Sequence, residues 1–295
     1  MRDKFVTRFA PSPTGHLHLG HAFSALQAWH AAREADGRFL LRIEDIDKGR
    51  CRPEFEATIM EDLAWLGIAW EEPVRRQSDH FADYETALDT LRAQGLLYPC
   101  FCTRREIADE IAHSPSAPHD LPGPKGPDGP IYPGICRDMS AHQIRLKEGV
   151  GAAYALRLDL EKATALLKQQ GDWPLRWQEG GGAPVKADPR SLGDVVLARK
   201  DTPTSYHLAV TVDDALQGVT HVIRGEDLFH ATHIHRVLQA LLGYPAPRYI
   251  HHPLIRDARG RRFAKRDKAE TLRSLRQGGE SPEAIINRLG NLTGG

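Results

Sequence analysis

Residues 4–45 read as a strand, a loop, a helix and a second strand, and this order constrains the fold more than any other feature. KFVTRF at 4–9 alternates as a strand does, and AFSALQAWHAAREADG at 22–37 has the apolar spacing of a helix. RFLLRIED at 38–45 carries a near-continuous apolar run, which is typical of a buried parallel strand. This βαβ unit predicts a ligand crevice beyond the carboxyl ends of its strands.

The loop APSPTGHLHLGH at 10–21 lies at the edge of that crevice and leads into the helix. Backbone N–H groups and the helix dipole favour an anion there, so the loop suits a nucleotide phosphate. His18 and His21 are three residues apart and share one face of the first turn, where two imidazole N–H donors could hold a triphosphate. The two common glycine patterns for phosphate binding do not fit this stretch, and a pair of surface histidines is the alternative interpretation.

The composition limits the partners that this chain can have. Its 295 residues carry 39 basic and 39 acidic side chains, so any affinity for nucleic acid must come from a local basic surface. No apolar run approaches membrane-spanning length, and the start MRDKFVTRF lacks the apolar core of a signal peptide. We therefore expect a cytoplasmic protein with no membrane association and no evident obligate protein partner, whose four cysteines are thiols or metal ligands.

Four further motifs follow the histidine loop along the chain. They are LRIEDID at 41–47, SYHLAVTVDD at 205–214, GVTHVIRGEDL at 218–228 and RRFAKRD at 261–267. Together with RFAPSPTGHLHLGH they resemble, in order, the signatures of the glutamyl- and glutaminyl-type class I aminoacyl-tRNA synthetases. In this resemblance HLGH at 18–21 stands for the family's H-I-G-H motif.

The resemblance implies an α/β fold with a Rossmann-type parallel-sheet catalytic domain. An inserted zinc-containing domain, similar to an acceptor-binding domain, would grip the RNA. We place the two catalytic halves at 1–97 and 191–255, the insertion at 98–190, and the lysine loop with a short helical C-terminal region at 256–295. Since the chain continues from Asp267 only to Gly295, we expect no anticodon-binding domain.

Several other elements are expected from local signals. Pro53 opens a helix that reaches Leu66, and another helix lies between Ser78 and Gly95. Thr103 and Glu106 form a capping box. The remaining expectations are strands within 195–199, 206–214, 219–225 and 249–255, a helix at 229–243 whose histidines face solvent or substrate, and a loop without helix or strand at 113–130.

The resemblance also implies a glutamate pocket at the strand ends. Arg8 would bind the side-chain carboxylate, because a guanidinium can hold a carboxylate through two hydrogen bonds. Glu44 would take the α-ammonium, Tyr206 would share recognition of the side chain, and Arg224 would neutralise the α-carboxylate region. Structural ion pairs or buried hydroxyls are the alternatives. The predicted lining is Arg8, Phe9, Ala10, Pro11, Ser12, Glu44, Tyr206 and Arg224.

ATP binding is expected at the histidine loop and the lysine loop. RFAKR at 262–266 departs from the family's lysine-loop pattern, because Arg262 replaces the first lysine and Ala264 replaces the serine. Lys265 matches the second lysine, which contacts the triphosphate in the family. Catalysis would rest on His18, His21 and Lys265, with Gly20 also at the nucleotide and Mg²⁺ bridging the phosphates.

Three cysteines in the middle of the chain have the spacing of a metal site. Cys100 and Cys102 are one residue apart, and Cys136 follows in a second knuckle. The resemblance supplies Tyr132 as the fourth ligand of a single structural Zn²⁺, although His113 or His119 could take that place. Three buried free cysteines are the alternative. The fourth cysteine, Cys51, is expected to be a plain thiol.

The short C-terminal region makes the chain similar to truncated paralogues of the glutamyl enzymes. These esterify glutamate to the queuosine base at the wobble position of tRNA(Asp). The implied substrates are ATP, L-glutamate and the tRNA(Asp) anticodon loop, and the implied activation to glutamyl-adenylate needs no tRNA. A minimal glutamyl-tRNA synthetase that charges a tRNA 3′ end is one alternative. A non-catalytic RNA-binding or amino-acid-sensing module is the other.

Overall fold

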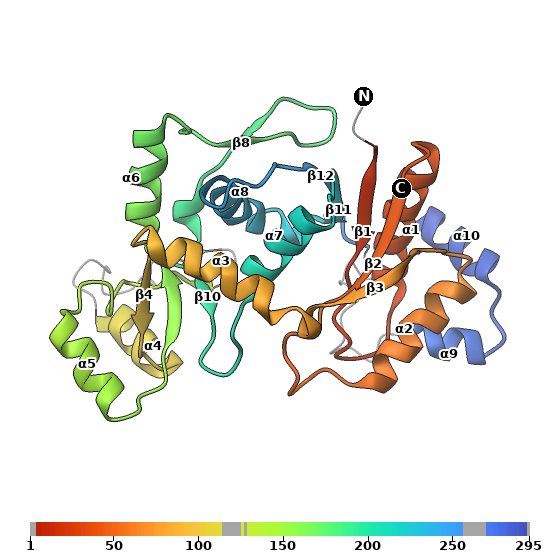
Figure 1. The fold of residues 1–295 in the computed structure, drawn as a ribbon. Coiled ribbons are helices and arrows are strands. Elements are labelled where there is room, and N and C mark those ends of the chain that lie inside the picture. The colour runs from red at the N-terminus through yellow and green to blue at the C-terminus, as the bar shows by residue number, and fades with distance from the viewer. Residues whose placement is uncertain (1–3, 114–124, 127–128, 256–269, 294–295) are drawn as a thin grey trace.

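The N-terminal part is a parallel three-stranded sheet with helices packed against it (Figure 1). The computed structural model describes residues 4–113, 125–126, 129–255 and 270–293. The sheet order is β1-β2-β3, and Val6 pairs with Arg38 in the parallel register that the βαβ unit predicts. Its elements are β1 (Val6–Phe9), α1 (Leu19–Glu34), β2 (Arg38–Ile43), α2 (Pro53–Trp65), β3 (Glu71–Arg76), the 3-10 turn Gln77–Asp79 and α3 (Phe81–Ala93).

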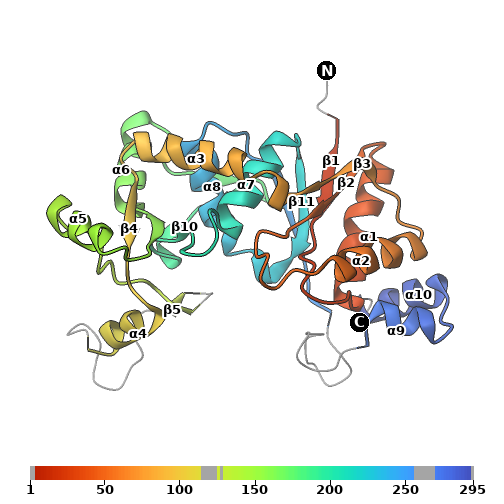
Figure 2. The ribbon, with the colours of Figure 1, turned by 60° about the horizontal axis from the view of Figure 1, so that its bottom comes forward.

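A second parallel pair of strands continues this layer on the other side of β1 (Figures 1 and 2). The backbone N–H of Thr220, just before β11, donates to the carbonyl of Val6 at 2.9 Å. β1 therefore lies between β2 and β11, and the carboxyl ends of these strands meet at one edge. The elements are α7 (Tyr206–Leu216), β11 (His221–Gly225), the 3-10 turn Glu226–Leu228, α8 (Ala231–Leu241) and β12 (Arg248–His252).

The expected strand at 206–214 is wrong, because this segment forms the helix α7. Ser205 is its N-cap residue, and its hydroxyl accepts a hydrogen bond from the backbone N–H of Leu208. Every residue from Leu208 to Asp214 is buried. Because no face of this part of the helix is exposed, the sequence shows no helical alternation of apolar and polar side chains, and the β-branched residues favour a strand.

The middle of the chain forms a separate antiparallel sheet with the order β10-β7-β4. It lies beside the parallel layer, with α5 and α4 at its far end (Figure 1). The strand within 195–199, expected among those of the second catalytic half, instead pairs antiparallel with β7. The elements are β4 (Leu97–Cys100), α4 (Arg104–His113), α5 (Ala141–Gly149), β7 (Ala155–Leu158), α6 (Leu160–Gln170), β8 (Arg176–Trp177), β9 (Val185–Lys186), the 3-10 turn Pro189–Ser191 and β10 (Val196–Ala198).

Two smaller expectations for this region have opposite outcomes. The capping box is confirmed, since the Thr103 hydroxyl accepts from the Glu106 N–H at 3.2 Å and the Glu106 carboxylate accepts from the Thr103 N–H at 2.6 Å. The loop expected at 113–130 is wrong at both described ends, since α4 includes His113 and β5 (Lys125–Gly126) pairs with β6 (Gly129–Pro130). Its residues 114–124 and 127–128 lie outside the described part of the chain. Gly129, the first residue of β6, has a φ of 117°, which few other residues adopt.

The histidines of α8 differ from their expected exposure. Only His230, just before the helix, is exposed, while His233 and His235 are buried. Ile234, Val237, Leu238 and Leu241 lie on one face of α8, which packs against α7 and α6, but the polar side chains of Thr232 and Gln239 are buried too, so little of the helix meets solvent.

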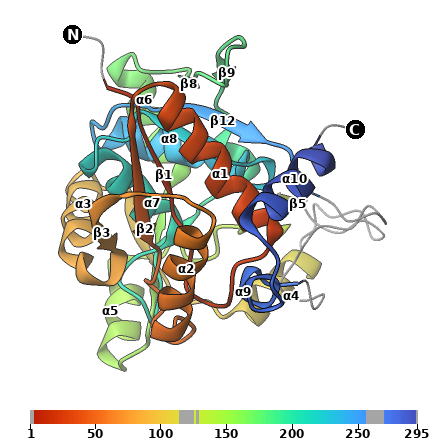
Figure 3. The ribbon, with the colours of Figure 1, turned by 90° about the vertical axis from the view of Figure 1, so that its right-hand side faces the viewer.

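Two short helices close the described chain, α9 (Leu272–Gln277) and α10 (Pro282–Thr293). Leu272 and Ile285 pack in the same core as the apolar side chains of α1 and α2, and Figure 3 shows α10 beside α1. This agrees with the short helical region expected there, whereas the lysine loop lies outside the described residues. Within the described residues, no helix combines the length and apolar character needed to cross a membrane.

Candidate active site

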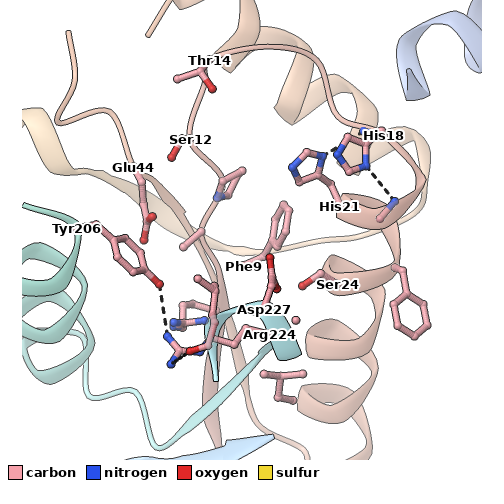
Figure 4. Close-up of a pocket in the computed structure, with 18 of the residues that line it drawn as sticks. Phe9, Ser12, Thr14, His18, His21, Ser24, Glu44, Tyr206, Arg224 and Asp227 are labelled. Carbon is pink, nitrogen blue, oxygen red and sulfur yellow. Dashed lines mark hydrogen bonds between the residues drawn. The ribbon is translucent and has the colours of Figure 1, made fainter. Parts of the chain in front are cut away.

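A cavity of about 700 Å³ opens at the carboxyl ends of β1, β2, β11 and β12 (Figure 4). The histidine loop and the first turn of α1 form one side, and Tyr206 from α7 faces them across the opening. The structure brings together every predicted glutamate and nucleotide residue except Lys265, which lies outside the described residues. These are Arg8, Phe9, Ala10, Pro11, Ser12, His18, Gly20, His21, Glu44, Tyr206 and Arg224.

His18 and His21 form a capping box at the start of α1. His18 Nδ1 accepts from the backbone N–H of Gly20 at 3.1 Å, and His21 Nδ1 accepts from the backbone N–H of His18 at 3.2 Å. Because a neutral imidazole has one donor and one acceptor nitrogen, both rings carry their proton on Nε2. The helix end therefore fixes the tautomer of two N–H donors at the cavity wall.

Arg8 is held by a buried ion-pair network under the cavity. Its guanidinium donates to Asp214 through Nε at 2.9 Å and through Nη2 at 3.4 Å, and Arg42 donates to the same carboxylate at 2.8 Å. Burial alone would raise the pKa of Asp214, but Arg8 and Arg42 outweigh it and hold that pKa below its usual value. A charged Asp214 thus fixes the orientation of Arg8 at the end of β1.

Glu44, directly after β2, contacts this network. Burial raises the pKa of Glu44 to about 7, although the positive charges of Arg42 and Arg8 offset part of that effect. Its carboxylate lies 3.5 Å from Arg42 Nη2. A carboxylate in this setting gains stability from a positively charged ligand such as an ammonium group.

Sequence reasoning missed the residues that position the predicted ones. Asp213 and Asp214 were visible as an acidic pair within an apolar motif, and that unusual pair is a signal for buried partners. Asp213 is fully buried and binds Arg75 at 2.8 Å and the Tyr84 hydroxyl at 3.1 Å. Cys51, expected to be a plain thiol, is half-buried and lines the cavity.

Similarity to known proteins identifies the family. The model described as tRNA synthetases class I (E and Q), catalytic domain, matches residues 4–294. A Glutamyl-Q tRNA(Asp) synthetase from Rhodobacter capsulatus is 50% identical over 290 residues, which cover 97% of this chain and 99% of that protein. The chain belongs to the Glutamyl-Q tRNA(Asp) synthetases. This confirms the family and the class of enzyme that the motifs predict.

Longer relatives match this synthetase over part of their length. A glutamate–tRNA ligase from Aquifex aeolicus is 37% identical, and the match covers 97% of this chain but 57% of the ligase. The crystal structure of a glutamate tRNA ligase from Elizabethkingia meningosepticum, in complex with its amino acid, superposes with a TM-score of 0.77 at 27% identity. The chain spans 60% of that ligase, and the likeness confirms the α/β fold class.

The cysteines of this synthetase form a cluster that could hold a metal ion. The Sγ atoms of Cys100, Cys102 and Cys136 all lie within 4.8 Å of one another. Thiolates in a tetrahedral zinc site lie about 3.8 Å apart, so the spacing fits. The Tyr132 hydroxyl lies 3.4 Å from Cys100 Sγ and 3.8 Å from Cys102 Sγ, distances that suit two ligands of one zinc ion. Among the alternatives for that place, the side chain of His113 and all of His119 lie outside the described part of the chain.

Proposed function

We propose that the chain activates L-glutamate with ATP and transfers it to the queuosine base at the wobble position of tRNA(Asp). The observation that carries this proposal is the convergence of Arg8, Glu44, Tyr206 and Arg224 with the histidine pair on one cavity. Two arginines suit the two carboxylates of glutamate, and the single carboxylate of Glu44 suits its ammonium group.

Recognition of glutamate would divide between the two arginines. Arg8, fixed by Asp214, would bind the side-chain carboxylate together with the Tyr206 hydroxyl. Arg224 would lie nearer to the α-carboxylate, on the β11 side of the cavity. An amino acid without the second carboxylate would gain no charge-assisted hydrogen bond from Arg8, which disfavours its binding relative to glutamate.

Activation needs positioning rather than proton removal. An α-carboxylate oxygen bonds to the α-phosphorus of ATP, and the bond from that phosphorus to pyrophosphate breaks. His18 and His21 would donate from Nε2 to the developing charge, with Lys265 from the lysine loop and the Mg²⁺ that accompanies ATP. Loss of one such donor should cost about 2–4 kcal/mol of transition-state stabilisation.

Transfer would follow from the chemistry of the modified base. Queuosine carries a cyclopentene diol, which offers hydroxyls as a terminal ribose does. One hydroxyl oxygen would bond to the carbonyl carbon of the adenylate, the bond from that carbon to the phosphate oxygen would break, and AMP would leave with the hydroxyl proton. We assign the grip on the anticodon loop to the inserted segment 98–190, with Zn²⁺ held by Cys100, Cys102, Cys136 and Tyr132 as its structural metal. As an enzyme acting on tRNA, the protein would work in the cytoplasm.

The test is transfer of labelled glutamate to tRNA(Asp) with and without queuosine. We expect transfer only to the modified tRNA, and periodate, which cleaves vicinal diols, should abolish acceptance. A minimal glutamyl-tRNA synthetase is the second candidate, because a glutamate–tRNA ligase matches 97% of the chain. Efficient charging of tRNA(Glu) at its 3′ end would establish that candidate instead. Absence of glutamate-dependent ATP–pyrophosphate exchange would favour a non-catalytic module.

A further inference from the structure

The guanidinium of Arg224 is surrounded by hydrogen-bond acceptors at different distances. Nη2 donates to the Thr232 hydroxyl at 2.7 Å and to the Leu228 carbonyl at 3.1 Å. Nε donates to His251 Nε2 at 3.1 Å. Nη1 has only long contacts, at 3.4 Å each, to the Tyr206 hydroxyl and His235 Nδ1. Nη1 therefore has the longest contacts of the three nitrogens, and a carboxylate in the cavity that Tyr206 lines could replace them.

His251 links Arg224 to an acidic residue outside the cavity. The side chain of His251 is 3% exposed, and its Nδ1 lies 2.9 Å from Glu179 Oε2. The backbone N–H of the same histidine donates to Glu179 Oε1 at 2.9 Å. Glu179 stands between β8 and β9, within the segment assigned to the insertion, and is not among the residues that line the cavity.

This arrangement fixes the tautomer of His251. Its Nε2 must accept, because a guanidinium has no acceptor, so its proton lies on Nδ1 and is donated to Glu179. Burial, together with the positive charge of Arg224, lowers the pKa of His251 to about 4, although Glu179 opposes this shift. The imidazole therefore stays neutral near neutral pH and keeps an acceptor for Arg224.

We infer that His251 and Glu179 are positioning residues for glutamate binding, which orient Arg224 through a carboxylate–imidazole–guanidinium chain and leave its Nη1 to the substrate. Neither residue has to touch the substrate for this role. The inference rests on the proposed function, since Arg224 must bind a carboxylate of glutamate. It also gives the inserted segment a part in the amino-acid pocket, through Glu179.

The most specific test is the variant Glu179→Gln, which keeps the size of the side chain and removes one hydrogen-bond acceptor. The carboxylate accepts two hydrogen bonds from His251, and a glutamine offers one oxygen and one N–H₂ donor in its place. The indole N–H of Trp177 also donates to Oε2, at 3.2 Å, so an amide nitrogen there would face two donors, and the ring would have to move its proton to Nε2 and lose the bond from Arg224. An amide nitrogen at the other position would instead face the backbone N–H of His251 and displace the ring. The expected result is a KM for glutamate higher on the order of tenfold in ATP–pyrophosphate exchange. The KM for ATP and kcat should change little.

A second series changes the imidazole itself. His251→Leu should raise the KM for glutamate at least as much as Glu179→Gln does. His251→Gln should restore part of the loss, because an amide can accept from Arg224 and donate to Glu179. His230→Leu is the matched control, since this histidine is exposed at the start of α8 and does not line the cavity. Its KM for glutamate should equal that of the unmodified protein.

Histidine ¹⁵N NMR spectra test the geometry without any activity. His251 should show a protonated Nδ1 and an unprotonated Nε2, and Glu179→Gln should reverse or mix that pattern. A His251 proton on Nε2 in the unmodified protein would overturn the inference, and so would unchanged glutamate binding in both Glu179→Gln and His251→Leu. If calorimetry shows no glutamate binding to the unmodified protein, the proposed function itself fails, whatever the tautomer.

Discussion

At the scale of residues, buried charge decides the shape of the amino-acid pocket. Arg8 and Arg42 are 5% and 0% exposed, and both bind the carboxylate of Asp214. Two guanidinium groups cannot share so small a buried volume without a counter-charge between them. Asp214 therefore supports the pocket from beneath, although the predicted ligand contacts belong to Arg8.

Asp214→Asn should be strongly destabilising. Removal of one charge from a buried network leaves the other charges uncompensated, which typically costs about 3–5 kcal/mol. Urea unfolding would measure the loss of free energy of unfolding. The matched control is Glu71→Gln, which breaks a pair with Arg38 whose side chains are 40% and 45% exposed. We expect that exposed pair to contribute less than about 1 kcal/mol. Equal losses in both variants would contradict the role given to Asp214.

Glu44 should make glutamate capture depend on pH near neutrality. Because its pKa is raised to about 7, the carboxylate is charged above that pH and becomes neutral as the pH falls through it. The neutral form loses its attraction for the ammonium of glutamate, so kcat/KM for glutamate should fall below about pH 7. Glu44→Gln should lower kcat/KM and remove this acidic limb. An unaltered acidic limb in that variant would assign the titration to another group.

At the scale of elements, the N-terminus of α1 serves structure and chemistry with the same two rings. The Nδ1 atoms of His18 and His21 cap the helix, and this use of Nδ1 places each proton on Nε2. A short N-cap residue such as Ser or Asp could accept the same backbone hydrogen bond equally well. It would not carry a second group, like Nε2–H, that can donate to a ligand. The same two histidines therefore stabilise the start of α1 and present two Nε2–H donors at the cavity.

Substitutions at His18 should separate those two contributions. His18→Asn keeps a good N-cap residue, whereas His18→Ala loses the cap and should lower the free energy of unfolding by about 1 kcal/mol. Both variants lose the Nε2 donor, so both should slow ATP–pyrophosphate exchange on the order of 10²-fold. Thermal unfolding and exchange rates, measured side by side, give the comparison. Near-normal exchange in His18→Asn would show that the ring donates nothing to the nucleotide.

At the scale of the whole molecule, the residues predicted to bind glutamate line one cavity of the protein by itself. The four predicted contact residues come from β1, the end of β2, α7 and β11, and they already face one cavity. We therefore expect glutamate-dependent ATP–pyrophosphate exchange in the absence of any tRNA. Addition of tRNA(Asp) should change that exchange rate by less than about threefold, since Arg8, Glu44, Tyr206 and Arg224 already line one cavity. Exchange that begins only after tRNA is added would show that RNA binding forms the pocket.

The metal site should be separable from that pocket. Metal analysis should find one Zn²⁺ per chain, and Cys100→Ser should remove it, because three remaining donors no longer close a tetrahedral site. The antiparallel sheet that carries Cys100 should then unfold at a lower temperature. Glutamate binding should persist, since these cysteines do not line the cavity at the parallel strands. Absence of zinc from freshly purified protein would contradict the predicted metal site.

Local signals in the sequence were enough for the parallel unit and the crevice. The strand–loop–helix–strand order predicted β1, α1 and β2. Because Arg8 and Glu44 come at the carboxyl ends of two of these strands, the order also predicted that they lie at one edge of the sheet. These inferences hold because parallel strands joined by a helix have one handedness and one ligand edge. The family motifs added Tyr206 and Arg224, which the structure places in the same cavity.

Only the tertiary structure decided what supports those residues. Arg8 and Asp214 are 206 residues apart in sequence, and His251 and Glu179 are 72 apart, so no local pattern pairs them. The helical state of α7 was hidden for a related reason. Hydrophobic periodicity reports the boundary between a buried and an exposed face, and a helix that is buried all round has no such boundary. The sequence determines which side chains reach the crevice, whereas packing between distant segments determines how they are oriented there.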